Sequence, residues 1–168
     1  VEGMQMAQEI LDRLLVEKRR WKGKGLIVQI PVDTLQTILY GWSVLCSSSL
    51  VARDRLNELL TLIVDEAKHD TESRAERIKL QESEEGAEVK TENDDEPLSQ
   101  PTVQVFNTYL QGLSNAAKLS PSVALEAEAA LYDMMEYHRS QGWHTKPNSR
   151  SYTHVITAFA NSGLSDAG

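Results

Sequence analysis

Cysteine, aromatic residues and long apolar runs are all scarce in this chain of 168 residues, which contains one cysteine and 6% aromatic residues. The single cysteine, Cys46, excludes a disulfide framework and indicates a reducing compartment. No run of about 18 apolar residues occurs, so the sequence predicts no membrane-spanning helix. No targeting segment is visible at the start, which fits either a chain whose leader has been removed or a piece of a longer protein.

Motifs for catalysis and for cofactor binding are also missing. The sequence contains no phosphate-binding loop, no GxGxxG motif and no nucleophile elbow. The four histidines, His69, His138, His144 and His154, lack the spacing of a zinc site, and no HExxH motif occurs. We therefore expect a protein that is not an enzyme and that binds no cofactor and no metal.

Acidic residues give the chain a net charge of −8, and their excess lies in one segment. Residues 64–100 contain thirteen acidic and five basic side chains, so the rest of the chain is neutral. Residues 69–100 have no aromatic residue and few aliphatic ones, so they cannot bury enough apolar surface to fold. We predict a disordered acidic insertion there, with an extension of the preceding helix through Arg77 and Lys79 as the alternative for its start. The insertion is either a solvated spacer or a segment that contacts a basic protein partner or competes with RNA for a basic groove.

Three segments share one apolar pattern, with apolar residues at positions i, i+3, i+4 and i+7, as on one face of an amphipathic helix. We call these the A-type helices. In each segment, a polar residue directly follows the first apolar residue, and a small residue lies six positions after the first apolar residue. The register of the first copy is open by one residue, because its proline lies four rather than five residues upstream. The apolar residues are Leu35, Ile38, Leu39 and Trp42; Phe106, Tyr109, Leu110 and Leu113; and Tyr152, Val155, Ile156 and Phe159.

A second set of helices with the same apolar spacing alternates with the first, and we call these the B-type helices. The alternation predicts an all-α protein, an α-solenoid of antiparallel helix pairs. The only run resembling a strand, residues 26–30, has no partner run. Because the chain opens with a B-type helix that lacks its A-type partner, we expect an interior or truncated portion of a longer array. The B-type apolar residues are Ala7, Ile10, Leu11 and Leu14; Leu56, Leu59, Leu60 and Ile63; and Ala127, Ala130, Leu131 and Met134.

Sequence signatures cluster between residues 103 and 163. They are VQVFNTYLQGLSNA at 103–116, ALEAEAALYDMM at 124–135 and KPNSRSYTHVITAFANSG at 146–163. An aromatic residue followed by Asn-Thr, an alanine-rich second helix and a closing Lys-Pro-Asn resemble the pentatricopeptide repeat family. The resemblance implies a right-handed superhelix interrupted by the acidic insertion. It divides the chain into incomplete PPR-like units over 1–68, the insertion over 69–100, the best-matched unit over 101–148 and a truncated first helix over 149–168.

The resemblance implies that the chain binds single-stranded RNA, with each unit reading one base through two or three side chains. By the family pattern, Asn107 with Asn148 would prefer a pyrimidine, cytosine over uracil, and Thr153 would lean toward a purine. A carboxamide suits this role because it offers both a donor and an acceptor to the edge of a base. The resemblance also implies that Gln36 pairs with Thr102 in binding RNA. The residues that would flank a bound base are Asp33 in the first copy, Gln104 in the second and Arg150 in the third.

The resemblance also implies a location in the mitochondrion or chloroplast and a role in organellar RNA processing, stability or translation. An alternative interpretation is a helical-repeat scaffold that binds proteins, in which Asn107 and Thr153 stabilise the first turns of their helices. The neutral remainder of the chain favours the scaffold, as does the spacing of 46 residues between Asn107 and Thr153, against a family period of about 35. The Asn-Thr and Lys-Pro-Asn signatures favour RNA, which we expect. The basic cluster at residues 17–24 either contacts phosphates or is a solvated helix end.

Overall fold

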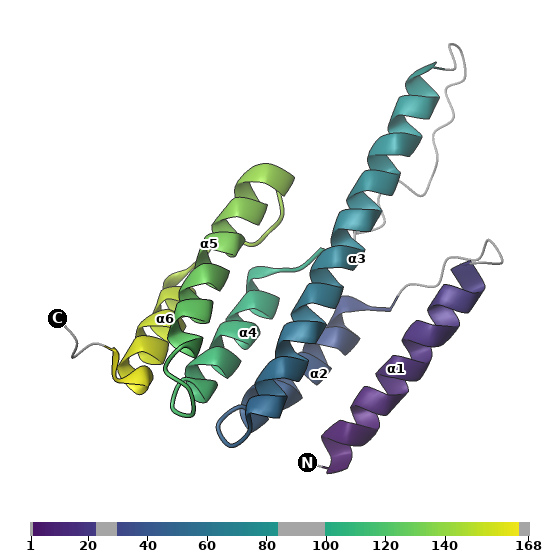
Figure 1. Ribbon diagram of the computed structural model, residues 1–168. Coiled ribbons are helices and arrows are strands. Elements are labelled where there is room, and N and C mark those ends of the chain that lie inside the picture. Colours follow the sequence, from purple (N-terminus) through teal and green to yellow (C-terminus); the bar gives the residue numbers. More distant parts are fainter. Residues whose placement is uncertain (1, 23–29, 84–99, 165–168) are drawn as a thin grey trace.

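The computed structural model describes residues 2–22, 30–83 and 100–164, which contain six α-helices and no β-strand (Figure 1). The predicted all-α class is thus confirmed for the described part of the chain. The helices are α1 (Glu2–Lys22), α2 (Val32–Leu45), α3 (Leu50–Ser83), α4 (Val103–Ala116), α5 (Val123–Gln141) and α6 (Ser149–Ser162). None of these helices is long and apolar enough to cross a membrane.

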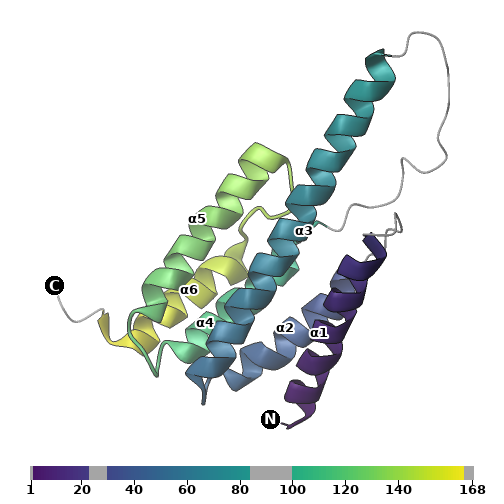
Figure 2. The same ribbon diagram turned by 45° about the vertical axis from the view of Figure 1, so that its right-hand side comes forward.

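The helices form two rows (Figures 1 and 2). The A-type helices α2, α4 and α6 pack side by side in one row. The B-type helices α1, α3 and α5 form the other row, and each contacts the A-type helices that precede and follow it among the described residues. Backbones of neighbouring B-type helices do not contact one another in this part of the chain. Helix α4 is therefore surrounded by four helices, whereas α1 and α6 lie at opposite ends of the molecule.

The A-type helices share one register. Each is 14 residues long, and the first apolar residue, Leu35, Phe106 or Tyr152, is the fourth residue of its helix. The one-residue ambiguity in the first copy is thereby removed. Equivalent positions can be compared directly, counting from that first apolar residue.

The core lies between the two rows. Gly112 of α4 marks the closest approach, because a Cβ there would lie 2.4 Å from Leu56 Cδ2 and 3.1 Å from the Cα of Ser43. The absence of a side chain lets α4 lie against both α2 and α3. The largest fully buried apolar side chains of these two rows include Leu39, Leu56, Leu59, Ile63, Phe106, Leu110, Leu113 and Met134.

The apolar stripes of the two outer helices are less buried than their pattern predicts. In α1, Ile10 and Leu14 are 54% and 46% exposed, although Leu11 is buried. In α6, Tyr152 and Ile156 are 46% and 68% exposed. The pattern of these helices is that of the central ones, but no helix in the described residues covers their outer sides.

Helix α3 corrects the predicted start of the acidic insertion. The helix has 34 residues and continues to Ser83, so residues 69–83 are helical rather than disordered. Its last turns extend well beyond the other helices (Figures 1 and 2). Charged residues of both signs alternate there and favour an exposed helix. The remainder of the predicted insertion, residues 84–99, lies outside the described residues, as do residues 26–29 of the strand-like run.

The loop after α5 is held against the helices. Trp143 is fully buried and lies 5.1 Å from the ring of Tyr137, measured between centroids. The buried hydroxyl of Thr145 donates to the carbonyl oxygen of Met134 at 3.0 Å, and the backbone N–H of Val103 donates to the carbonyl oxygen of His144 at 2.9 Å. This long connection, which has no assigned role in the sequence pattern, is therefore part of the core.

Candidate nucleic-acid interface

The side of α4 that faces away from the B-type helices defines a surface that we call the open face. The side chains of α4 that are not buried lie along this stripe, apart from Val103 at its start. Equivalent positions of α2 and α6 are also at least partly exposed. The open face comprises Asp33, Thr37 and Tyr40 of α2; Gln104, Thr108 and Gln111 of α4; and Arg150, His154 and Thr157 of α6.

Charge is sparse on the open face. Arg150 carries the only permanent positive charge among these nine residues, and Asp33 carries a negative one. Partial burial lowers the pKa of His154 below its ordinary value, and the positive charge of the nearby Arg150 lowers it further. The His154 imidazole is therefore uncharged at neutral pH, and the open face has no net charge to attract phosphates.

The three threonines of the open face direct their hydroxyl groups inward, and the Thr157 hydroxyl donates to the carbonyl oxygen of Thr153 at 2.7 Å. The Thr37 hydroxyl donates to the carbonyl oxygen of Asp33 at 2.8 Å, and the Thr108 hydroxyl donates to that of Gln104 at 3.0 Å. These hydroxyls retain acceptor capacity toward a ligand, while their donors are used by their own helices.

A network of polar side chains joins α4 to the start of α6. Asn107 Nδ2 donates to Asn148 Oδ1 at 3.4 Å, although the two residues are 41 positions apart in sequence. The Ser151 hydroxyl donates to Asn107 Oδ1 at 2.7 Å. Both polar ends of the Asn107 side chain are therefore engaged within the protein, and Asn107 is 7% exposed.

Asn148 is also the N-cap of α6. Its Oδ1 atom accepts from the backbone N–H groups of Arg150 and Ser151 at 3.0 and 3.2 Å, and the Ser151 hydroxyl accepts from the Asn148 backbone N–H. This reciprocal arrangement is a capping box. Every hydrogen bond of the Asn148 amide to the described residues uses the oxygen, and Asn148 is an exposed residue, so its Nδ2 group remains available to donate to a ligand.

The other predicted RNA-binding residues are distributed along the A-type row. Gln104 and Arg150 lie on the open face, and Thr102 is the N-cap of α4 without a capping hydrogen bond from its side chain. Gln36 and Thr153 occupy the position equivalent to Asn107; Gln36 is half-buried and Thr153 is exposed. The Thr153 hydroxyl donates to the carbonyl oxygen of Ser149 at 2.8 Å. Among the predicted pairs, Asn107 and Asn148 are joined by a hydrogen bond, whereas Gln36 and Thr102 are not.

The predictions missed Ser151, the residue that covers Asn107. It occupies the position directly before the first apolar residue of α6, where α4 has Val105. A hydroxyl residue three positions after an asparagine, as in Asn148-Ser-Arg-Ser151, is compatible with a capping box and would have indicated a cap at Asn148. Its contact with Asn107 carries no local sequence signal, because the two residues meet only through the packing of α4 on α6.

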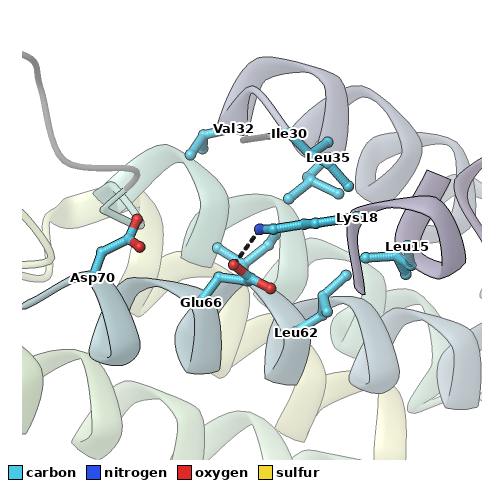
Figure 3. A pocket seen from close by; sticks show the side chains of 9 residues that line it. Leu15, Lys18, Ile30, Val32, Leu35, Leu62, Glu66 and Asp70 are labelled. Carbon is cyan, nitrogen blue, oxygen red and sulfur yellow. Dashed lines mark hydrogen bonds and ion pairs between the residues drawn. The ribbon is translucent and has the colours of Figure 1, made fainter. Parts of the chain in front are cut away.

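A small cavity lies away from the open face, between α1, α2 and α3 (Figure 3). Lys18 reaches across it from α1 to form an ion pair with Glu66 of α3. Its volume of about 10 Å³ is at the lower limit for one water molecule. In the described residues, no group of three or more His, Cys, Asp or Glu side chains is placed to hold a metal ion.

Comparison with protein-family models, with curated proteins and with solved structures gives no match to this chain.

Proposed function

We propose that the two rows of helices are part of a PPR-like α-solenoid and that its open face binds single-stranded RNA. The protein would act by positioning or protecting an organellar transcript in the mitochondrion or chloroplast, without catalysis of its own. The contact between Asn107 and Asn148 supports this proposal most directly. The family pattern from which we infer RNA binding assigns these two residues to the reading of one base. Their side chains are adjacent despite their separation in sequence.

The chemistry of this pair suits the edge of a base. Asn148 Nδ2 can donate to a base oxygen or ring nitrogen, and the Asn107 carboxamide adds an acceptor and a donor. Base contact with Asn107 requires the Ser151 hydroxyl to move away from Asn107 Oδ1. The family resemblance implies a pyrimidine at this site.

The sparse charge of the open face determines how the affinity depends on salt. For single strands, the logarithm of the affinity falls by about 0.7 per phosphate contact for each tenfold rise in salt. Arg150 supplies the single permanent cation of the open face, so the dependence should be shallow. Arg150→Ala should reduce the slope by about 0.7 and should weaken binding to all sequences equally.

The direct experiment measures the fluorescence anisotropy of labelled single-stranded RNA as protein is added. A randomised pool identifies preferred sequences, and Asn148→Ala should then lose discrimination at one base, by about 1–3 kcal/mol by analogy with other base contacts. Gln141→Ala is the matched control, because Gln141 is an exposed carboxamide on α5 in the other row. Absence of salt-sensitive binding to any pool would rule the proposal out. An equal loss of affinity for all sequences in Asn148→Ala would show that Asn148 does not read a base.

A protein-binding scaffold is the second candidate, and the engagement of Asn107 by Ser151 favours it. In this case the Asn107–Asn148 contact is structural, and the open face, which carries no net charge, accommodates a polypeptide. The anisotropy experiment distinguishes the two candidates, because a scaffold would bind none of the RNA pools while keeping its fold.

A further inference from the structure

Tyr40 of α2 is the only Phe, Tyr or Trp among the nine residues of the open face, and it is 55% exposed. In a helix with 3.6 residues per turn, a residue five positions after Leu35 lies about 140° around the axis from it, away from the core. The equivalent residue of α4, Gln111, is also partly exposed, although α4 has A-type neighbours on both sides. Tyr40 is therefore exposed because of the side of the row on which it lies, and a further helix beside α2 would leave it accessible.

The Tyr40 side chain lacks the contacts that fix two other tyrosines. In the described part of the chain, its hydroxyl makes no hydrogen bond and its ring packs on no other aromatic ring. By contrast, the Tyr109 hydroxyl donates to Asn57 Oδ1 at 2.9 Å. The Tyr137 ring lies 5.1 Å from that of Trp143, measured between centroids. The Tyr40 ring is thus available to a ligand on the open face.

The place of Tyr40 on α2 brings its ring close to the position that the family pattern assigns to a base. Long side chains of a helix point back toward its N-terminus and lie over the residues three and four positions earlier. For Tyr40 these residues are Thr37 and Gln36, and Gln36 occupies the position equivalent to Asn107. The Thr37 hydroxyl donates to a backbone carbonyl of α2, so it does not compete for a ligand as a donor. The Tyr40 ring therefore borders a half-buried carboxamide and an uncharged side chain.

We propose that Tyr40 is a stacking platform for one base of a single-stranded RNA. Every base has a π face, so a tyrosine ring holds a base without reading its identity. Such a contact suits α2, because Gln36 and Thr102 are not joined by a hydrogen bond as Asn107 and Asn148 are. The first copy of the pattern would hold a base by stacking, whereas the second would read one. This inference rests on the proposed binding of RNA to the open face.

Stacking supplies affinity that the charge of the open face does not supply. Arg150 is the single permanent cation of this face, so contacts with phosphates are few. Stacking of an uncharged ring on a base releases no counterions, and its contribution is therefore insensitive to salt. A loss of affinity without a change in salt dependence distinguishes Tyr40 from Arg150.

The experiment measures the affinity of variants for labelled single-stranded RNA by fluorescence anisotropy. Tyr40→Ala should weaken binding to all sequences by about 5- to 150-fold and should leave the salt dependence unchanged. Tyr40→Phe keeps the ring and should bind as the wild type does, whereas Tyr40→Leu is apolar without a π face and should bind weakly. Tyr132→Ala is the matched control, because Tyr132 is 61% exposed but lies on α5 in the other row. Helical circular dichroism checks the fold of each variant.

Strands that lack one base identify the stacked nucleotide. Abasic sites are placed one at a time along the RNA, and each strand is measured with the wild type and with Tyr40→Ala. At one position, the abasic strand should bind the wild type as weakly as the intact strand binds Tyr40→Ala. The variant should show no further loss at that position, because the same contact has already been removed. At positions remote from Tyr40, the two losses should add.

The outcomes separate this inference from the proposed function. Binding by Tyr40→Ala as tight as that of the wild type would overturn stacking and leave RNA binding in place. An equal loss in Tyr40→Phe would assign the effect to the hydroxyl group, and losses that add at every abasic position would show that no base contacts the ring; either result overturns stacking. A wild-type protein that binds no single strand would overturn both proposals and leave Tyr40 on a surface for a polypeptide.

Discussion

The Nδ2 atom of Asn161 in α6 donates to the backbone carbonyl oxygen of Ser114 in α4 at 2.9 Å. Asn115 of α4 makes the same contact with the carbonyl oxygen of Ser43 in α2 at 3.1 Å. Both asparagines are nine positions after the first apolar residue of their helices, and both serines are eight positions after it. The same side-chain hydrogen bond therefore joins each pair of neighbouring A-type helices at equivalent positions. The residues that form it are not part of the apolar pattern that defines these helices.

The first prediction concerns this repeated contact. Asn115→Ala removes one hydrogen bond between α2 and α4 and should lower the free energy of unfolding by about 1 kcal/mol. Urea denaturation followed by circular dichroism measures the change. Gln111→Ala is the control, because Gln111 is a carboxamide on the same helix and makes no hydrogen bond to another of the six described helices. Equal stabilities for the two variants would show that the contact between Asn115 and Ser43 contributes nothing.

The second prediction compares two glycines at equivalent positions. Gly112→Ala should destabilise the protein by about 1–3 kcal/mol, because the new methyl group overlaps Leu56 and approaches the backbone of Ser43. Gly41→Ala meets only the flexible side chain of Met4, so the gain in helix propensity should make it neutral or stabilising by up to about 1 kcal/mol. Thermal denaturation of both variants measures the difference. Similar changes for both would contradict the close approach of α4 to its neighbours.

The helix types and their register could be predicted from the sequence because the apolar spacing repeats. The pattern could not predict that Ile10 and Ile156 are exposed, since periodicity indicates the side of a helix that packs but not whether a partner is present. The predicted insertion began too early, although an extension of the preceding helix through Arg77 and Lys79 was left open; α3 continues to Ser83. Its last turns have low apolar content, which resembles disorder, while their alternating charges are compatible with an exposed helix.

The candidate site was predictable only in part. The adjacency of Asn107 and Asn148 follows from the packing of α4 on α6, while their role as a pair that reads a base stays a prediction. The burial of Asn107 was not predictable, because it depends on Ser151 in the next helix. The burial of Trp143 was missed for a similar reason. Trp143 lies in an irregular loop that has no periodic pattern, and its ring packs on Tyr137 of α5.

The third prediction concerns Cys46, whose thiol is fully buried. Burial raises the pKa of Cys46 to about 12, and the charge of Arg53 opposes this effect. The folded state therefore holds the proton more tightly than the unfolded chain, so this group makes stability fall as the pH rises from about 9 to about 12. Denaturation at several pH values should show a shallower fall for Cys46→Ala. Cys46 should also resist alkylation at pH 8 unless the protein is unfolded; rapid labelling of the folded protein would contradict its burial.

The last prediction tests the obstacle to base contact at Asn107. Ser151→Ala removes the hydroxyl that donates to Asn107 Oδ1 and accepts from the Asn148 backbone N–H. Stability should fall by about 1 kcal/mol through loss of half of the capping box.

The same variant should bind a pyrimidine-containing single strand more tightly by up to about tenfold, which corresponds to the roughly 1.4 kcal/mol of one hydrogen bond that no longer has to be broken. Fluorescence anisotropy measures the affinity, with Ser149→Ala as the control on the first turn of α6. The gain should vanish in Asn107→Ala/Ser151→Ala, because the acceptor released by Ser151 is then absent. An unchanged affinity of Ser151→Ala, or a gain that persists without Asn107, would mean that the RNA does not contact Asn107 and that the pair serves to join α4 to α6.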